Sequence, residues 1–161
     1  MEKSSPNVSL RHLLSGQEAL ASDLVMRSYR AATTTDDSPE GVEEFTRYAA
    51  PASIRGRLSA GSIVMVAFLG ASAAGVVEIR LPGHIGLLFI SSDHQGRGIG
   101  RRLCEAAIEA FARRYTRPSK VTVKASPGSV AFYEKLGFVT AGGVTEFNGI
   151  RFVPMERELG V

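Results

Sequence analysis

A glycine-rich run in the middle of the chain is the strongest chemical signal in the sequence. The run, Gln95-Gly96-Arg97-Gly98-Ile99-Gly100, stands between a nearly continuous apolar segment and the best amphipathic helical pattern of the chain. The first turn of a helix presents unpaired N–H groups and a partial positive charge, and glycines keep side chains away from those amides. Arg97, Arg101 and Arg102 add positive charge beside them. This combination predicts a cradle for the oxygens of a phosphate or diphosphate.

The spacing of these glycines distinguishes the run from two other phosphate-binding loops. A P-loop needs a lysine followed by serine or threonine after its last glycine, and neither follows here. A dinucleotide fingerprint needs G-x-G-x-x-G, whereas the glycines here stand at alternate positions after an antiparallel-looking hairpin. What remains is the pattern Q-x-x-G-x-G, carried by Gln95, Gly98 and Gly100.

A second motif follows downstream, Phe132-Tyr133-Glu134-Lys135-Leu136-Gly137-Phe138, with a short strand-like segment over 120–124 before it. With both motifs in this order, the chain resembles the GNAT superfamily of CoA-dependent N-acetyltransferases. In that family a loop of Gln or Arg, then x-x-G-x, then Gly or Ala joins the fourth strand to the next helix. The resemblance is sharpest from His84 to Phe138. It implies an acetyl-CoA-dependent N-acetyltransferase in which a primary amine attacks the thioester directly within a ternary complex, with acetyl-CoA (coenzyme A) as cosubstrate and no metal.

The resemblance also implies roles for individual residues. Tyr133 matches the family tyrosine that points at the CoA sulfur as general acid. Ser126 stands where the family often has an asparagine that contacts the pantetheine arm, and its hydroxyl either reaches the cofactor or only caps the following helix. The residues expected to contact the cofactor are Leu88, Phe89 and Ile90 through their main chain, the loop residues Gln95, Gly96, Arg97, Gly98, Ile99, Gly100 and Arg101, and Ser126 and Tyr133.

The acceptor amine needs a base, because a lysine-like amine has a pKa of about 10.4 and must lose a proton before it attacks. Some family members carry a glutamate at the start of the fourth strand, eleven residues before the glutamine of the loop, and here that position holds His84. A histidine with an unperturbed pKa of about 6.5 suits this role near neutral pH. A strand-end histidine that is merely exposed or hydrogen-bonded is the alternative. Glu78, in the preceding strand, is the competing base, directly or through water.

The elements that must position these residues form a mixed pattern. Turn signals at Gly70-Ala71-Ser72 and Asn148-Gly149 predict two hairpins, and Pro154 predicts that the last strand is an edge, at least locally. The predicted fold class is α/β (α+β), one domain over 1–161 with a mixed, mostly antiparallel sheet of six to seven strands, flanked on both faces by about four helices. The predicted strands are 7–11, 63–69, 73–80, 84–91, 120–124, 144–147 and 150–156, and the predicted helices are 15–30, one through Val42, Phe45 and Tyr48, a short one over 53–58, 98–115 and 126–136.

Bulk composition excludes several classes of protein. The 161 residues carry a formal charge of +3, which is too weak to indicate a nucleic-acid partner by itself. No apolar stretch is long enough for a membrane span, and the first residues have no apolar core of a secretory signal. The single cysteine, Cys104, rules out an internal disulfide and is interpreted as a small packed residue. These features favour a cytoplasmic protein.

The partner expected from the resemblance is an amine acceptor, either a small molecule or a protein amine. Glu40, Glu43 and Glu44 either attract a cationic amine or form a solvated helix face. The predicted C-terminal edge strand leaves a homodimer possible. The alternative function is a non-catalytic acyl-CoA-binding sensor or regulatory module of the same fold. Tyr133 and His84 favour the enzyme, because a sensor needs neither.

Overall fold

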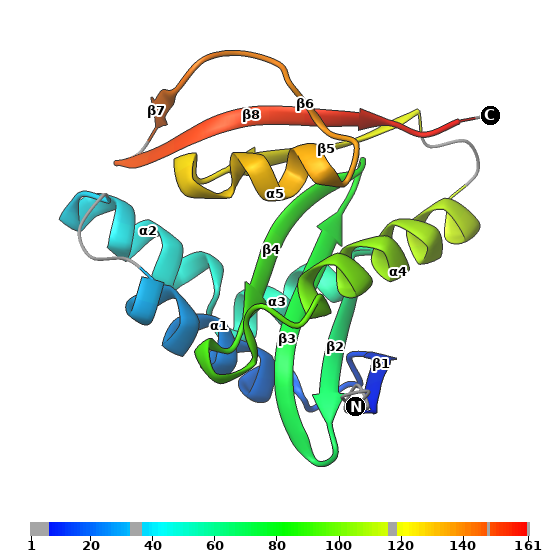
Figure 1. Cartoon of the computed structure of the whole chain (residues 1–161). Coiled ribbons are helices and arrows are strands. Elements are labelled where there is room, and N and C mark those ends of the chain that lie inside the picture. The colour runs from blue at the N-terminus through cyan, green and yellow to red at the C-terminus, as the bar shows by residue number, and fades with distance from the viewer. Residues whose placement is uncertain (1–6, 33–36, 116–118, 148, 161) are drawn as a thin grey trace, which may run out of the picture.

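The computed structural model describes residues 7–32, 37–115, 119–147 and 149–160. Within these ranges its helices and strands follow the order that the sequence predicts (Figure 1). The α-helices are α1 (Glu18–Ala32), α2 (Pro39–Tyr48), α3 (Pro51–Ser59), α4 (Ile99–Arg114) and α5 (Val130–Lys135). The strands are β1 (Val8–His12), β2 (Ile63–Leu69), β3 (Ser72–Arg80), β4 (His84–Ile90), β5 (Lys120–Ala125), β6 (Val139–Thr140), β7 (Thr145–Phe147) and β8 (Ile150–Glu158). Two 3₁₀ turns cover Ser92–His94 and Pro127–Ser129.

The strands form one mixed sheet with the order β1-β2-β3-β4-β5-β8-β6, and β7 pairs with β8 beside this path. Every neighbouring pair is antiparallel except β4 and β5, which are parallel. The predicted fold class is therefore confirmed, and each predicted helix range contains a helix, whereas the short strand β6 was not predicted.

The side chains of the sheet alternate between two hydrophobic clusters, as the period of two residues in a strand requires. One cluster joins Val77 and Ile79 of β3 to α4 and α5. The other joins Val76 of β3 to Leu24 of α1 and Ile54 of α3. Helices thus cover both faces of the sheet, with α1, α2 and α3 on the face opposite α4 (Figure 1).

Two predicted details of the C-terminal half need correction. The strand with Pro154 is not an edge along its length, because β8 lies between β5 and β6, although Pro154 itself is part of neither the β6 nor the β7 ladder. The Pro154 carbonyl accepts a hydrogen bond from Ala141 N–H on the β6 side (2.8 Å). The N–H and C=O groups of one strand residue point to the same side, so the N–H that proline lacks would also face β6. The hydrogen bonds between β8 and β5 are therefore not interrupted. The helix predicted over 126–136 is also shorter, because Pro127 and Gly128 form a 3₁₀ turn and α5 begins only at Val130.

In the part of the chain that the structure describes, no helix combines the length and apolar character that crossing a membrane requires.

Candidate active site

The parallel strands β4 and β5 form a fork. They pair only through His84 with Thr122 and through Ile85 with Val123, and beyond these residues they diverge (Figure 1). A β-bulge in the pairing of β3 with β4 inserts Gly86 at this branch point. Bulges bend a strand and end regular pairing, so the rest of β4 keeps β3 on one edge and leaves the other edge open.

Leu88 and Ile90 turn their main-chain groups toward the open edge of β4. The N–H of Ser91 donates to the carbonyl of Ala74 in β3 (2.8 Å). Because N–H and C=O groups alternate sides along a strand, Leu87 and Phe89 also bond toward β3, and Leu88 and Ile90 do not. The Gln95 side chain donates to the Ile90 carbonyl (3.3 Å). Leu88 therefore offers the free donor and acceptor to an extended ligand lying in the fork.

The glycine-rich loop lies where β4 ends and α4 begins. Gly98 is the N-cap of α4 with a φ of 77°, Gly96 has a φ of 78°, and no side chain caps the helix. The N–H of Arg102 makes the first helical bond, to the Gly98 carbonyl (3.2 Å). The amides before Arg102 therefore have no acceptor within the helix. Gln95, Gly96, Arg97 and Gly98 are exposed, and the first turn of α4 adds Ile99, Gly100 and Arg101. Such a terminus binds anions.

The first turn of α4 also contacts the helix that carries Tyr133. A Cβ added to Gly100 would lie 3.4 Å from the Phe132 ring of α5 and 3.5 Å from the Ile90 side chain of β4. Gly100, Phe132 and Ile90 therefore meet at one point. This contact brings α5 next to the open edge of β4.

Tyr133, on α5, is a buried tyrosine. Its side chain is only 6% exposed and packs edge-on against Phe132 and Phe138. Its hydroxyl has no hydrogen-bond partner among the described residues, and it is not fully shielded from solvent. Burial, and then the nearby Cys104 thiol, raise the pKa of the Tyr133 hydroxyl well above its usual range. The hydroxyl therefore keeps its proton at neutral pH and can give it to a strongly basic group.

His84 stands at the closed end of the fork. Its Nδ1 lies 2.7 Å from the Thr122 hydroxyl of β5, which leaves Nε2 for another partner. Burial, followed by the positive charges of Arg80 and Lys124, lowers the pKa of His84 to about 4. The imidazole is therefore neutral at physiological pH and able to accept a proton, although it is a weaker base than an exposed histidine.

Glu78 is fully buried and paired with a cation. Both of its carboxylate oxygens accept hydrogen bonds from Arg57 of α3, from Nε (2.7 Å) and from Nη2 (3.0 Å). The Arg57 guanidinium lies over the Tyr48 ring, 3.8 Å from its centre. The Tyr48 hydroxyl sits in the notch at Gly86, where an added Cβ would lie 2.0 Å from it. Glu78 thus anchors a stack of side chains against the β4 bulge, and proton transfer to it would disrupt the Arg57 pair.

Two other residues considered from the sequence have simple surroundings. The Ser126 hydroxyl is 2.7 Å from the Ser129 hydroxyl, is exposed and does not cap the following turn. Cys104 is completely buried, and burial raises the pKa of its thiol to about 12. A thiol that stays protonated is a poor nucleophile, so Cys104 is a packing residue.

The face of the sheet opposite α4 carries an aromatic wall beside the fork. Tyr29 of α1 stacks on Phe45 of α2, and both contact Phe89 of β4. On the other side of the fork, the Lys124 ammonium lies over the rings of Phe147 and Phe152, at 5.7 and 5.1 Å from their centres. These two groups of aromatic side chains lie on the two sides of the β4–β5 branch point.

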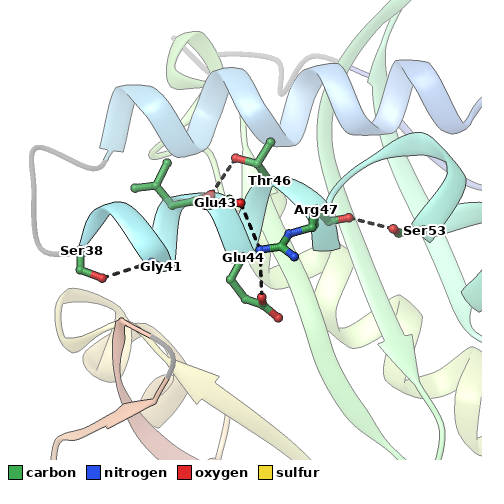
Figure 2. Close-up of polar contacts among 8 residues, drawn as sticks. Ser38, Gly41, Glu43, Glu44, Thr46, Arg47 and Ser53 are labelled. Carbon is green, nitrogen blue, oxygen red and sulfur yellow. Dashed lines mark hydrogen bonds and ion pairs between the residues drawn. The ribbon is translucent and has the colours of Figure 1, made fainter.

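The start of α2 is joined to the β7–β8 turn across this space. The Ser38 N–H donates to the Gly149 carbonyl (3.0 Å), and the Ser38 hydroxyl accepts from Gly41 N–H (3.2 Å; Figure 2). Farther along α2, Glu43 and Glu44 both pair with Arg47 and are exposed (Figure 2). Glu40 is exposed as well, as a solvated helix face requires, and the attraction of a cationic amine to these glutamates stays a prediction.

Several side chains at the fork were not found from the sequence. Arg57, Arg80 and Lys124 belong to three different elements, and no local spacing connects them. Tyr48 was assigned only to the apolar side of a helix, although its hydroxyl reaches the bulge. A signal for Arg57 existed in principle, since a buried strand glutamate such as Glu78 requires a cation.

Comparison with known proteins agrees with this geometry. Residues 33–159 match the model of the acetyltransferase (GNAT) domain family. A GCN5-related N-acetyltransferase from Rhodopseudomonas palustris has 27% identity and a TM-score of 0.79 over 99% of both chains. The PaiA N-acetyltransferase from Thermoplasma acidophilum, solved in complex with coenzyme A, has 16% identity and a TM-score of 0.76 over 95% of this chain and 99% of that one. An acyl-CoA N-acyltransferase from Pseudomonas aeruginosa has 21% identity and a TM-score of 0.65 over 94% and 98%. No curated protein matches.

Proposed function

Because the chain belongs to the GNAT acetyltransferase family, we propose that it is an acetyl-CoA-dependent N-acetyltransferase in which a primary amine attacks the thioester directly. The observation that carries this proposal is the fork itself, an open β4 edge that lies between an uncapped helix N-terminus and a buried, protonated tyrosine. A ligand with an anionic end, an amide-bearing arm and a sulfur at its tip fits these three features in that order. Bound acetyl-CoA would supply the acetyl group as an activated thioester.

The residues around the fork fit coenzyme A on chemical grounds. The amides of the α4 first turn and of the loop, from Gln95 to Arg101, would hold the diphosphate. The main chain of Leu88 would pair with the pantetheine amides as an added strand does, with Phe89 and Ile90 flanking it. The coenzyme A complex of the Thermoplasma structure, which has the same fold, supports this assignment. Ser126 is exposed at the start of the turn before α5 and would contact the arm only through its hydroxyl.

Two proton transfers complete the proposed reaction. Tyr133 would donate its proton to the departing thiolate, since its raised pKa keeps it protonated until a stronger base appears. His84 would accept the proton of the attacking amine at Nε2, directly or through water, while Thr122 fixes the ring through Nδ1. Glu78 is the second candidate base, and its pairing with Arg57 favours His84 for the first place.

The test has two readouts, acetyl-CoA binding by calorimetry and free-thiol release over a panel of amines. Gly98→Ala should weaken acetyl-CoA binding at least about tenfold, because a φ of 77° strains any side chain at the helix cap. Gly56→Ala, an addition into open space on α3, is the matched control and should leave binding unchanged. Tight binding without thiol release over the whole panel would favour the non-catalytic sensor. No acyl-CoA binding at all would refute both functions.

A further inference from the structure

A group of polar side chains occupies the sheet face opposite α4, at the branch point of β4 and β5. Glu78 and Arg80 come from β3, His84 from β4, and Thr122 and Lys124 from β5. Their neighbours in sequence point the other way, into the cluster that packs on α4. Those neighbours are Val77, Ile79, Ile85, Val121 and Val123. Because side chains alternate along a strand, the five polar residues share the face from which an acceptor would approach the fork.

Two of the cations on this face have no carboxylate partner. Arg57 is neutralised by Glu78 (2.7 Å), and Lys120 is neutralised by Glu156 (3.0 Å). Neither Arg80 nor Lys124 forms an ion pair with any described residue. The Arg80 guanidinium lies beside the Tyr48 hydroxyl, but its buried Nε makes no well-formed hydrogen bond. Lys124 rests on two aromatic rings instead of on a carboxylate.

Both unpaired cations stand next to the reaction centre. Arg80 is the cross-strand partner of His84. Lys124 directly follows Val123, the last β5 residue that pairs with β4, and therefore lies at the mouth of the fork. After burial, the positive charges of these two side chains also contribute to the lowered pKa of His84.

Arg80 is half-buried, and an unpaired cation in such a site is unfavourable unless an anion compensates it, whereas Lys124 is exposed and adds a positive charge at the rim. An acceptor that brings only a positive amine into this site would be repelled by both side chains. An acceptor that also carries an anion would satisfy the orphaned Arg80 donor and offset the Lys124 charge. The guanidinium of Arg80 and the ammonium of Lys124 are both suited to binding the carboxylate of an acceptor.

We propose that the acceptor is an amine with a carboxylate close to its reacting nitrogen, as in an α-amino acid, and that Arg80 and Lys124 bind this carboxylate. The inference rests on the proposed acetyltransferase function and specifies its substrate class. Arg80 and Lys124 bind the acceptor beside His84, and the aromatic wall of Tyr29, Phe45 and Phe89 accommodates its side chain.

The experiment compares matched acceptors that differ only in the carboxylate. A panel of α-amino acids and their α-carboxamides is assayed for thiol release with saturating acetyl-CoA. The kcat/KM for the acids should exceed that for the amides at least about tenfold at equal concentrations of the unprotonated amine, since one well-placed charge pair is typically worth that factor or more. Arg80→Gln and Lys124→Gln should each remove most of this preference, taken as the ratio of the two kcat/KM values within one variant, because a change in the basicity of His84 affects acids and amides alike. Lys135→Gln, an exposed lysine on α5, is the charge-matched control and should leave the preference unchanged.

Acetyl-CoA binding is measured for every variant, because it separates this inference from the proposed function. Thiol release with equal kcat/KM for acids and amides overturns the carboxylate site and leaves the acetyltransferase intact. If no acceptor releases thiol, binding of the acids and amides to the CoA-saturated protein decides, and the absence of a carboxylate preference again overturns the site. Failure to bind acetyl-CoA refutes the proposed function and the inference together. A carboxylate preference that survives both substitutions overturns the assignment to Arg80 and Lys124.

Discussion

Replacing Gly86 by alanine should destabilise the fold, because the added methyl group would overlap with the Tyr48 side chain. The added Cβ would lie 2.0 Å from the Tyr48 hydroxyl oxygen, 3.1 Å from Cζ and 3.5 Å from Cε1. Tyr48 cannot easily withdraw, since the Arg57 guanidinium lies on its ring and is held by Glu78. Overpacking of this kind costs typically about 1–3 kcal/mol, and the severe overlap places Gly86→Ala at the upper end.

The same geometry predicts a rescue. Tyr48→Phe removes the atom at 2.0 Å, and the nearest remaining atom, at 3.1 Å, needs only a small shift of the ring. The Tyr48 hydroxyl is buried beside Arg80 without a well-formed hydrogen bond, so Tyr48→Phe alone should change stability by only about 1 kcal/mol. The double variant should regain most of the stability that Gly86→Ala loses, with a coupling of about 2 kcal/mol.

Urea unfolding of the four proteins at one pH measures this coupling. For a chain of this size, a loss of about 3 kcal/mol lowers the melting temperature by about 6–12 °C, which a thermal scan also resolves. Gly56→Ala is the control for adding a methyl group without crowding. Additive effects of the two substitutions would refute the reasoning, because the bulge would then be sensitive to the methyl group for a reason other than the hydroxyl.

Two further predictions concern the proton carriers. Tyr133→Phe should lower kcat by a factor of about 10²–10⁴ through loss of the acid, while the acetyl-CoA dissociation constant should change less than about threefold. Steady-state kinetics measures the first effect and calorimetry the second. An unchanged kcat would remove Tyr133 from the mechanism. For His84, a folded-state pKa of about 4 against an ordinary 6.5 means that the unfolded chain takes up the proton first as the pH falls. Stability should therefore be complete above pH 6.5 and fall by about 3 kcal/mol, to order of magnitude, between there and pH 4. Urea unfolding across this pH range measures the effect, and the fall in stability assigned to His84 should be missing in His84→Asn. The same pH dependence in the variant and in the unchanged protein would contradict the assignment.

The sequence was most informative where the signal is local. The loop from Gln95 to Gly100 and the helix after it could be predicted because capping glycines and a helical stripe are properties of adjacent residues. The hairpin at Gly70 followed from turn chemistry, and that glycine has a positive φ of 61°. The late start of α5, at Val130 instead of Ser126, was not predicted, because Pro127 fits the first turn of an α-helix as well as a 3₁₀ turn.

The electrostatics of the fork could not be predicted, because they depend on contacts between remote segments. Arg57 and Glu78 are 21 positions apart and meet only when α3 packs on β3. The low pKa of His84 depends on burial and on charges from two other strands. The sequence assigned this histidine an ordinary pKa for the same reason. Alternation along β5 places Lys124 on the acceptor face, but only the short β4–β5 ladder places it at the mouth of the fork.

The close approach of Gly100 to Phe132 and Ile90 connects the two ends of the proposed cofactor site. The start of α4 would set the diphosphate end and Tyr133, the neighbour of Phe132 on α5, would set the sulfur end, so the spacing of α4 and α5 would fix the distance between them. If the arm of a thioester were shorter or longer than pantetheine, its sulfur would therefore not lie beside Tyr133 while its diphosphate is bound at the start of α4. Discrimination between carriers of different arm length thus follows from the distance between two helices, without any side chain that touches the variable part.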